Sequence, residues 1–179
     1  MNMPTRRTCL RAAGSVALAA AATAATWPAR AQSFDPAHGA WTVLLRKHVR
    51  LLRGGQATQV HYAGMATDRP ALKAYLDSLS AVPAAVFAAW PKAERQAFLI
   101  NAYNAFTVEL ILTRHPDLKS IKDLGSLLTS PWKPKWIALL GTKVSLDDIE
   151  STLRKPTDFG FQWAEDARIH SAINCASIR

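Results

Sequence analysis

Apolar and polar residues alternate with a helical period at the start of the chain beyond residue 31. Between Asp35 and Gly54, apolar residues recur every three or four positions, which is the spacing of one buried helix face. That face comprises Trp41, Leu44, Leu45, His48 and Leu52. Asp35 suits the N-cap and Pro36 the first helical position. The pattern therefore predicts a helix that begins at Pro36, includes Leu52 and ends at Gly54–Gly55.

Two further helices are predicted in the middle of the chain. The first follows a short β-prone run at 60–62, begins at Asp68–Pro70 and ends before Pro83. Its apolar face carries Leu72, Tyr75, Leu76 and Leu79. The second begins after Pro91 and runs towards Pro116, with apolar residues nearly all round it. A helix of that kind is buried on most sides, so we expect it to be the central core helix.

The pattern changes to strands in the last third of the chain. Trp136–Leu140 is predicted to be a strand, Gly141–Thr142 a turn and Lys143–Val144 the returning strand. Ser145 then has the chemistry of an N-cap, and Asp148 is placed to reach back to it in a capping box. A helix should follow.

That helix is predicted to run to about Arg154, and a loop with Phe159, Phe161 and Trp163 should lead to a final buried strand over 166–173 that enters an Asn174–Cys175 turn. Helices outnumber strands, and the strands cluster late. We therefore expect an α+β fold: one helix-rich domain over residues 32–179 with a long central helix and a small antiparallel sheet.

Residues 1–31 have the pattern of an export signal. Arg6–Arg7 precede an alanine-rich run, 12–27, and Ala29–Arg30–Ala31 is a small-x-small cleavage pattern. The paired arginines, the mild apolar run and Arg30 favour twin-arginine export, with an ordinary secretory signal as the alternative. Both routes place the remaining chain in the periplasm. The apolar run is too short to predict a membrane span.

Removal of this segment changes the charge and the cysteine count. The segment carries four Arg and no acid, so the net charge falls from +9 for the whole chain to +5 for the remainder. The remaining surplus forms no Lys/Arg block, which argues against nucleic-acid binding. Cys175 is then the only cysteine, so a disulfide within the domain is excluded. The histidines show no metal-ligand spacing, and nothing calls for a cofactor.

Cys175 is the candidate with the most reactive chemistry. A thiol attacks as its thiolate and needs a base or a positive environment nearby. His170 is five residues away, and in a regular strand it would point to the opposite face. The alternatives are a buried structural thiol at Cys175 and a surface or structural histidine at His170.

Polar residues on the predicted helices form a second set of candidates. Asn101 and Asn104 share a face of the long helix and would either bond neighbouring backbone, which ties a loop to the helix, or contact a substrate. Glu109 on the same helix needs a partner such as Arg. Asp147 and Glu150 belong to the capped helix, where helix-end stabilisation is the simpler role.

Four motifs in order resemble the domain-of-unknown-function family 547. They are Asn-Ala-Tyr-Asn-Ala at 101–105, Ser-Ile-Lys-Asp-Leu at 120–124, Gly-Thr-Lys-Val-Ser-Leu-Asp-Asp-Ile-Glu at 141–150, and Arg-Ile-His at 168–170 with Asn174–Cys175. The resemblance extends from about Phe34 to Arg179. It implies an architecture similar to papain-like or transglutaminase-like thiol enzymes.

By the same resemblance, Cys175 would be the nucleophile and His170 and Glu150 its supporting residues. Substrate-binding or scaffolding roles would fall to Asn101, Asn104, Arg168 and Asn174. The chain departs from the family at Ser151, where relatives often have His, and in ending at Arg179, where relatives continue. We therefore expect the domain to be incomplete at its C-terminal end, without the backbone N–H groups of an oxyanion site.

These features predict an exported periplasmic binding or assembly module. Its partner would be a cell-envelope peptide or protein, without nucleic acid and without a stable membrane span once the signal is removed. The alternative is a Cys-dependent hydrolase or acyl-transferase that acts on peptide-like amides and is inactive here if the chain is incomplete. A shortened product without a function of its own is the third hypothesis.

Overall fold

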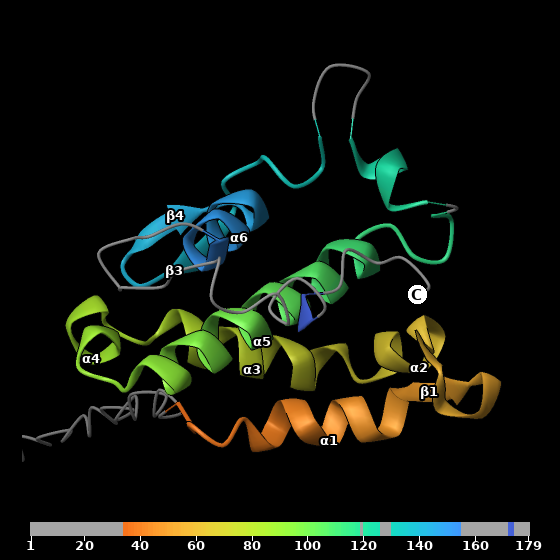
Figure 1. Cartoon of the computed structure of the whole chain (residues 1–179). Coiled ribbons are helices and arrows are strands. Elements are labelled where there is room, and N and C mark those ends of the chain that lie inside the picture. The colour runs from red at the N-terminus through yellow and green to blue at the C-terminus, as the bar shows by residue number, and fades with distance from the viewer. Residues whose placement is uncertain (1–33, 119, 126–129, 155–171, 174–179) are drawn as a thin grey trace, which may run out of the picture. The chain divides into compact units, whose positions relative to one another are not determined.

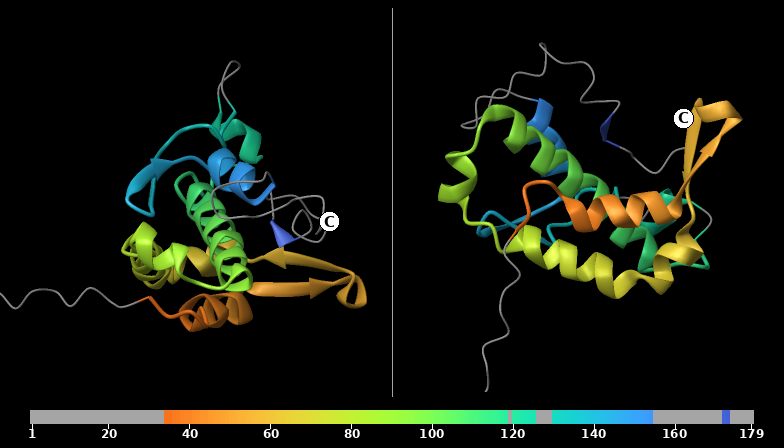
Figure 2. Two further views of the ribbon diagram at one scale, coloured as in Figure 1. Left: turned by 60° about the vertical axis from the view of Figure 1, so that its left-hand side comes forward. Right: turned by 90° about the horizontal axis from the view of Figure 1, so that it is seen from below.

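The long central helix predicted from the sequence is present and organises the rest of the fold (Figure 1). The structure is a computed structural model, and it describes residues 34–118, 120–125, 130–154 and 172–173. Helix α5 spans Lys92–Leu112, 21 residues, and begins after Pro91 as expected. Helices α1 and α3 lie on one side of it, and α6 with the β3–β4 hairpin on the other (Figure 2).

The first helix is shorter than the sequence predicts, because its expected last turn is a strand. Helix α1 spans Gly39–His48, and residues Val49–Leu52 form β1. β1 pairs in antiparallel register with β2, Ala57–Val60. The predicted continuation through Leu52 is wrong, because pairing with a strand further along the chain outcompetes local helical periodicity.

The turn of this hairpin is the single-turn helix η1, Arg53–Gly55. Gly54 and Gly55 have φ angles of 65° and 95°, a backbone conformation that glycine adopts without steric cost. The hairpin projects beyond the end of α1 (Figure 2).

Asp35 does not start the helix at Pro36. Its carboxylate instead accepts the backbone N–H groups of Ala37 and Gly39, so it caps a turn that precedes α1.

Two short helices flank α3, and neither was predicted. Helix α2 spans Tyr62–Thr67, although Tyr62 was expected to be β-prone, and α4 spans Ala84–Ala88. Helices of one or two turns carry too few apolar positions to show a period. Helix α3, Arg69–Ser80, has the bounds and the buried face that the sequence predicts. That face consists of Leu72, Tyr75, Leu76 and Leu79.

The last described elements follow the prediction closely. Strands β3, Ile137–Leu139, and β4, Thr142–Val144, form an antiparallel hairpin. Ser145 and Asp148 form the expected capping box: the Asp148 N–H donates to Ser145 Oγ at 3.0 Å, and the Ser145 N–H donates to Asp148 Oδ2 at 2.9 Å. Helix α6 then spans Leu146–Arg154 and packs on α5. A 3-10 turn, η2, covers Ile121–Leu124.

The α+β class is confirmed, with one difference in the strands. The described residues contain two separate two-stranded sheets, where one small sheet was expected. The final strand is wrong at its two described residues, since Ala172 is helical and Ile173 lies in a bend. Ile173 is nevertheless 1% exposed and belongs to the core. No helix in the described ranges is long and apolar enough to cross a bilayer.

Candidate functional site

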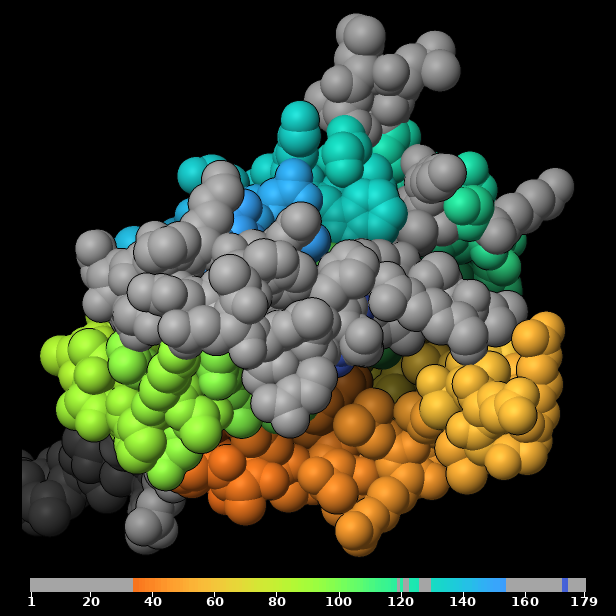
Figure 3. All heavy atoms as spheres, viewed as in Figure 1, coloured from red at the N-terminus to blue at the C-terminus, as the bar shows by residue number. Residues whose placement is uncertain are grey.

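A cavity of about 460 Å³ lies between α1, the β1–β2 hairpin, the start of α2 and α5. Its volume falls within the range of sites that bind small molecules. The residues that line it are Trp41, Leu45, Arg46, Val49, Thr58, Val60, Tyr62, Asn101, Asn104, Thr107 and Val108. Figure 3 shows α1 and the hairpin region side by side along one edge of the molecule. We regard this cavity as the candidate functional site.

Regular spacing brings these residues to one place. On α1, Trp41 and Leu45 are four residues apart and share a face. On β2, Thr58 and Val60 are two residues apart and point to the same side of the hairpin. Val49 lies opposite Val60 in the strand register and completes that side. The hairpin register therefore decides which side chains enter the cavity.

Helix α5 supplies the opposite wall. Asn101, Asn104 and Val108 follow one another at helical spacing, so they line one face together with Thr107. Thr107 is 3% exposed, and its hydroxyl donates to the Tyr103 carbonyl at 2.8 Å. This wall combines two side-chain amides with an apolar surface.

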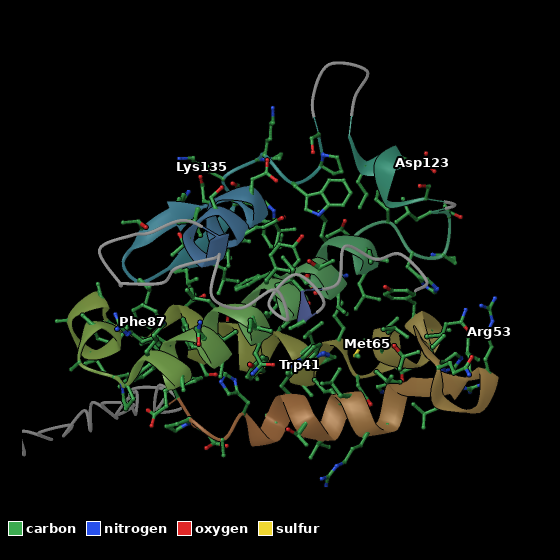
Figure 4. All side chains as sticks on the ribbon, viewed as in Figure 1. Trp41, Arg53, Met65, Phe87, Asp123 and Lys135 are labelled. Carbon is green, nitrogen blue, oxygen red and sulfur yellow. The ribbon has the colours of Figure 1, made fainter. Side chains whose placement is uncertain are left out.

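Trp41 gives the cavity a buried aromatic lining. Trp41, labelled in Figure 4, points from α1 into the interior and is 2% exposed. Its ring stacks on Tyr75 with centroids 5.8 Å apart and planes 4° apart. The indole Nε1 is buried without a hydrogen-bond partner among the described residues. A buried donor of this kind lowers stability by roughly 1–3 kcal/mol, which is unusual in a well-packed wall.

The two asparagines have different surroundings. Asn104 Nδ2 donates to the backbone carbonyl of Ala172 at 2.9 Å, so it ties a distant segment to α5, which is the structural alternative considered for this pair. Asn101 is half-buried, and its side-chain amide has no hydrogen bond within the described part of the chain. Asn101 therefore offers both a donor and an acceptor at the cavity wall.

The remaining polar groups of the cavity are Tyr62 and Arg46. Burial raises the pKa of the Tyr62 phenol, so this side chain is neutral at physiological pH. Arg46 is exposed at the wall that α1 contributes. Among the described residues that line the cavity, none is acidic.

Glu109, for which the sequence predicts a partner such as Arg, has one. Arg69 donates from Nη2 to Oε1 at 2.7 Å and from Nε to Oε2 at 3.2 Å. The Glu109 side chain is 6% exposed, and Lys73 Nζ lies 3.9 Å from Oε1. Hydrogen bonding to Glu109 raises the pKa of Arg69. This pair joins α3 to α5 and does not line the cavity.

A second ion-pair cluster fixes the base of the hairpin. His48 is 3% exposed, and its Nε2 donates to Asp68 Oδ2 at 2.7 Å. Lys47 Nζ lies 2.7 Å from the same oxygen, and its hydrogen bond, followed by that of His48, lowers the pKa of Asp68. A Cβ on Gly64 would lie 2.6 Å from His61 Nδ1 and 2.7 Å from His48 Nδ1, so only glycine fits there.

A second, smaller cavity of about 360 Å³ lies beside the start of α1 and includes His38 and Tyr75 in its wall. His38 Nδ1 is 2.6 Å from the Tyr75 hydroxyl. Burial lowers the pKa of His38 and raises that of Tyr75, so both are neutral at physiological pH. The two neutral groups share one hydrogen bond, which holds the start of α1 to α3.

The other residues predicted for a site are not gathered at the cavity. Glu150 is half-buried on α6 and does not line it. The remaining four, Arg168, His170, Asn174 and Cys175, lie outside the described residues. No group of three or more His, Cys, Asp or Glu that could hold a metal is present among the residues that the structure describes.

Sequence reasoning identified the asparagine pair but missed most of the cavity. The sequence assigned Trp41 and Leu45 to a buried helix face. It gave no indication that Arg46, Thr58 and Tyr62 belong to a binding site. The approach of Thr58 to the cavity depends on the hairpin register, which no local pattern reveals. The spacing of Asn101 and Asn104 on an otherwise apolar helix was the one available indication.

Comparison with known protein families identifies a match over part of the chain. Residues 87–179 match the family described as "Protein of unknown function, DUF547". The match is narrower than the span from about Phe34 that the motifs suggested: it includes α5 and α6, whereas α1, the β1–β2 hairpin, α2 and α3 precede it. No curated protein and no solved structure matches the chain.

Proposed function

The chain belongs to the DUF547 family of proteins of unknown function, and from this premise we propose that it is an exported binding module whose cavity takes a peptide-like ligand. The ligand would place an apolar side chain between α1 and α5. Its peptide group would pair with the side-chain amide of Asn101. The cavity with its mixed lining is the observation that carries this proposal.

The chemistry of the lining supports a peptide-like ligand. Trp41, Leu45, Val60 and Val108 form an apolar surface that favours an aliphatic or aromatic group. A primary amide such as that of Asn101 can pair with a peptide group as donor and acceptor at once.

Two neighbouring features fit an extended ligand. The bond from Asn104 to the Ala172 carbonyl is an example, on the same helix face, of an asparagine amide that holds a peptide group. Leu51 lies opposite Thr58 in the hairpin register and is 73% exposed, so the apolar surface continues past the cavity. A ligand longer than one residue would cover Leu51 as well.

The direct test is a titration of the protein with N-acetyl-L-phenylalaninamide, in which the ¹H–¹⁵N NMR chemical shifts of the protein report binding. A ligand of this size is expected to bind with a Kd on the order of 1 mM. Thr58→Trp fills the cavity from the exposed side of β2 and should weaken binding at least about tenfold. Gln59→Trp is the matched control, because it changes the next residue, on the other face of the hairpin.

The result separates a specific site from general apolar adsorption. The proposal is supported if the chemical-shift changes are confined to residues of the cavity and disappear in Thr58→Trp but not in Gln59→Trp. Absence of binding, or equal loss in Thr58→Trp and Gln59→Trp, contradicts it.

The export part of the proposal rests on the pattern of residues 5–31. A twin-arginine signal requires both arginines of its pair, so Arg6→Lys with Arg7→Lys should leave the protein in the cytoplasm of a bacterial host. Cell fractionation reads this directly. Unchanged periplasmic recovery of the double variant would assign the protein to the general secretory route.

The alternative function, a Cys175-dependent hydrolase or acyl-transferase with a papain-like or transglutaminase-like architecture, has one supporting observation. Ala172, three residues before Cys175 in the sequence, is bonded to the cavity residue Asn104. A catalytic thiol would react with iodoacetamide faster than a model thiol below neutral pH. Cys175→Ser would abolish turnover, whereas a binding module would keep its ligand affinity in that variant.

A further inference from the structure

The charges at the cavity indicate which end of a peptide the site would take, given the function proposed above. We infer that the ligand is the C-terminal residue of a peptide with an apolar side chain, and that Arg46 binds its free carboxylate. The apolar group fills the cavity, and the preceding peptide group meets Asn101 on the opposite wall.

Charge complementarity is the first step. Arg46 carries the only formal charge among the described residues that line the cavity, since Tyr62 is neutral there. An apolar cavity with a cation at its edge favours an apolar ligand that carries an anion, because the anion gains an attraction that a neutral ligand does not.

The availability of Arg46 is the second step. Its neighbour Lys47 is engaged with Asp68, and Arg69 with Glu109. Arg46, by contrast, makes no ion pair or side-chain hydrogen bond within the described part of the chain. A ligand carboxylate would therefore displace no existing partner.

Geometry is the third step. The guanidinium is a planar fork that matches the two oxygens of a carboxylate, which lysine cannot reproduce. Arg46 comes from α1 and Asn101 from α5, so the charged group and the amide enter the cavity from different helices, and Trp41 and Val108 supply apolar lining from the same two helices. A C-terminal residue has a carboxylate and an amide on either side of one side chain, in the order that this arrangement requires.

The test compares N-acetyl-L-phenylalanine with N-acetyl-L-phenylalaninamide, which differ only in the free carboxylate. At pH 7 and low salt, the purified protein should bind the acid about fivefold more tightly than the amide, as expected for one partly exposed ion pair. Added NaCl should reduce this preference, because salt screens exposed charges. NMR titration measures both affinities.

Two substitutions locate the effect. Arg46→Gln should remove the preference for the acid, so that the variant binds the acid and the amide with equal affinity. Arg50→Gln is the matched control: Arg50 is exposed nearby on β1, pairs with Gln59 in the register and does not line the cavity. The preference should persist in that variant.

The outcomes separate this inference from the function on which it rests. If neither probe binds, the proposed function itself fails. If both bind equally to the unchanged protein, the cavity is a binding site but the inference about the carboxylate is overturned. An equal loss of preference in Arg46→Gln and Arg50→Gln also overturns it, because the net charge then explains the effect.

Discussion

Glu109 and Arg69 show how one buried charge determines the chemistry around it. A carboxylate that is 6% exposed on an apolar helix is stable only because a guanidinium donates to both of its oxygens. The sequence predicted this requirement correctly, although it could not say which arginine would meet it. Arg69 is 40 residues distant in sequence, and several other arginines were equally available.

We predict that Arg69→Ala lowers the free energy of unfolding by about 2 kcal/mol. Removal of one partner from a fully buried pair costs about 3–5 kcal/mol, and the value here is smaller because the Arg69 side chain is 39% exposed. Urea unfolding at pH 7 measures the change. Lys73→Ala is the control, since Lys73 Nζ is 3.9 Å from the carboxylate and should contribute less than about 0.5 kcal/mol.

The double variant Arg69→Met with Glu109→Leu should recover most of the lost stability, because it removes both charges from the buried site together. A loss that persists in this double variant would contradict an electrostatic cause and indicate lost packing.

The pKa of Asp68 predicts an acid-sensitive hairpin base. Hydrogen bonds from Lys47 and His48 hold this pKa below its ordinary value of 3.8, so the folded state favours the carboxylate. The stabilisation is therefore fully present above about pH 4 and is lost as the pH falls through the lowered pKa. Urea midpoints measured from pH 6 to pH 2 should fall less steeply for Asp68→Asn than for the unchanged protein.

Asp77→Asn is the matched control for this experiment, because Asp77 is exposed on α3 and has no ion pair in the described part of the chain. Its pH profile should follow that of the unchanged protein. If Asp68→Asn does so too, the cluster does not contribute to acid stability.

Among the elements, α6 shows how a local signal can specify both a boundary and a packing position. Ser145 is 2% exposed and exchanges two hydrogen bonds with Asp148, so the first turn of α6 is fixed where the helix meets the core. We predict that Ser145→Ala lowers the free energy of unfolding by about 1–2 kcal/mol, because the Asp148 N–H loses its acceptor. Thermal unfolding followed by circular dichroism measures the change.

Ser151→Ala provides the comparison, since Ser151 is exposed on the same helix and alanine is the better helix former. It should leave stability unchanged or slightly higher. Equal losses in the two variants would mean that the capping box does not hold the helix end.

The elements also show what the sequence can and cannot predict. The sequence predicted helices α3, α5 and α6 and the β3–β4 hairpin, because caps, turns and hydrophobic periodicity within a few residues indicate each of them. The sequence did not predict the α1–β1 boundary, because Val49–Leu52 continues the helical period. This segment is a strand only through its pairing with Ala57–Val60. Thr58, one of the missed residues of the cavity, depends on that same pairing.

At the scale of the whole molecule, the candidate site crosses the boundary of the family match. Asn101 and Asn104 lie within the matched residues 87–179, whereas Trp41, Arg46 and Thr58 precede them. The N-terminal elements therefore supply the cavity residues that lie outside the match, and α5 supplies the amides that lie within it.

The same division predicts that the matched part does not fold alone. Helix α5 buries residues all round, including Phe98 at 0% and Phe106 at 4% exposure, and α3 packs against it within the same hydrophobic core as α1. A chain of residues 87–179 would leave this apolar surface uncovered, and the loss of burial at about 25 cal/mol per Å² lowers the stability of a fold that is only marginally stable. We expect residues 32–179 to melt cooperatively and residues 87–179 to show no cooperative transition by calorimetry.

Addition of a separate 32–86 chain should restore a transition at least in part, because it returns α1 and α3 to the uncovered side of α5. A sharp melt of residues 87–179 alone would instead make the N-terminal part a separable attachment, and the cavity would then lie between two independent units.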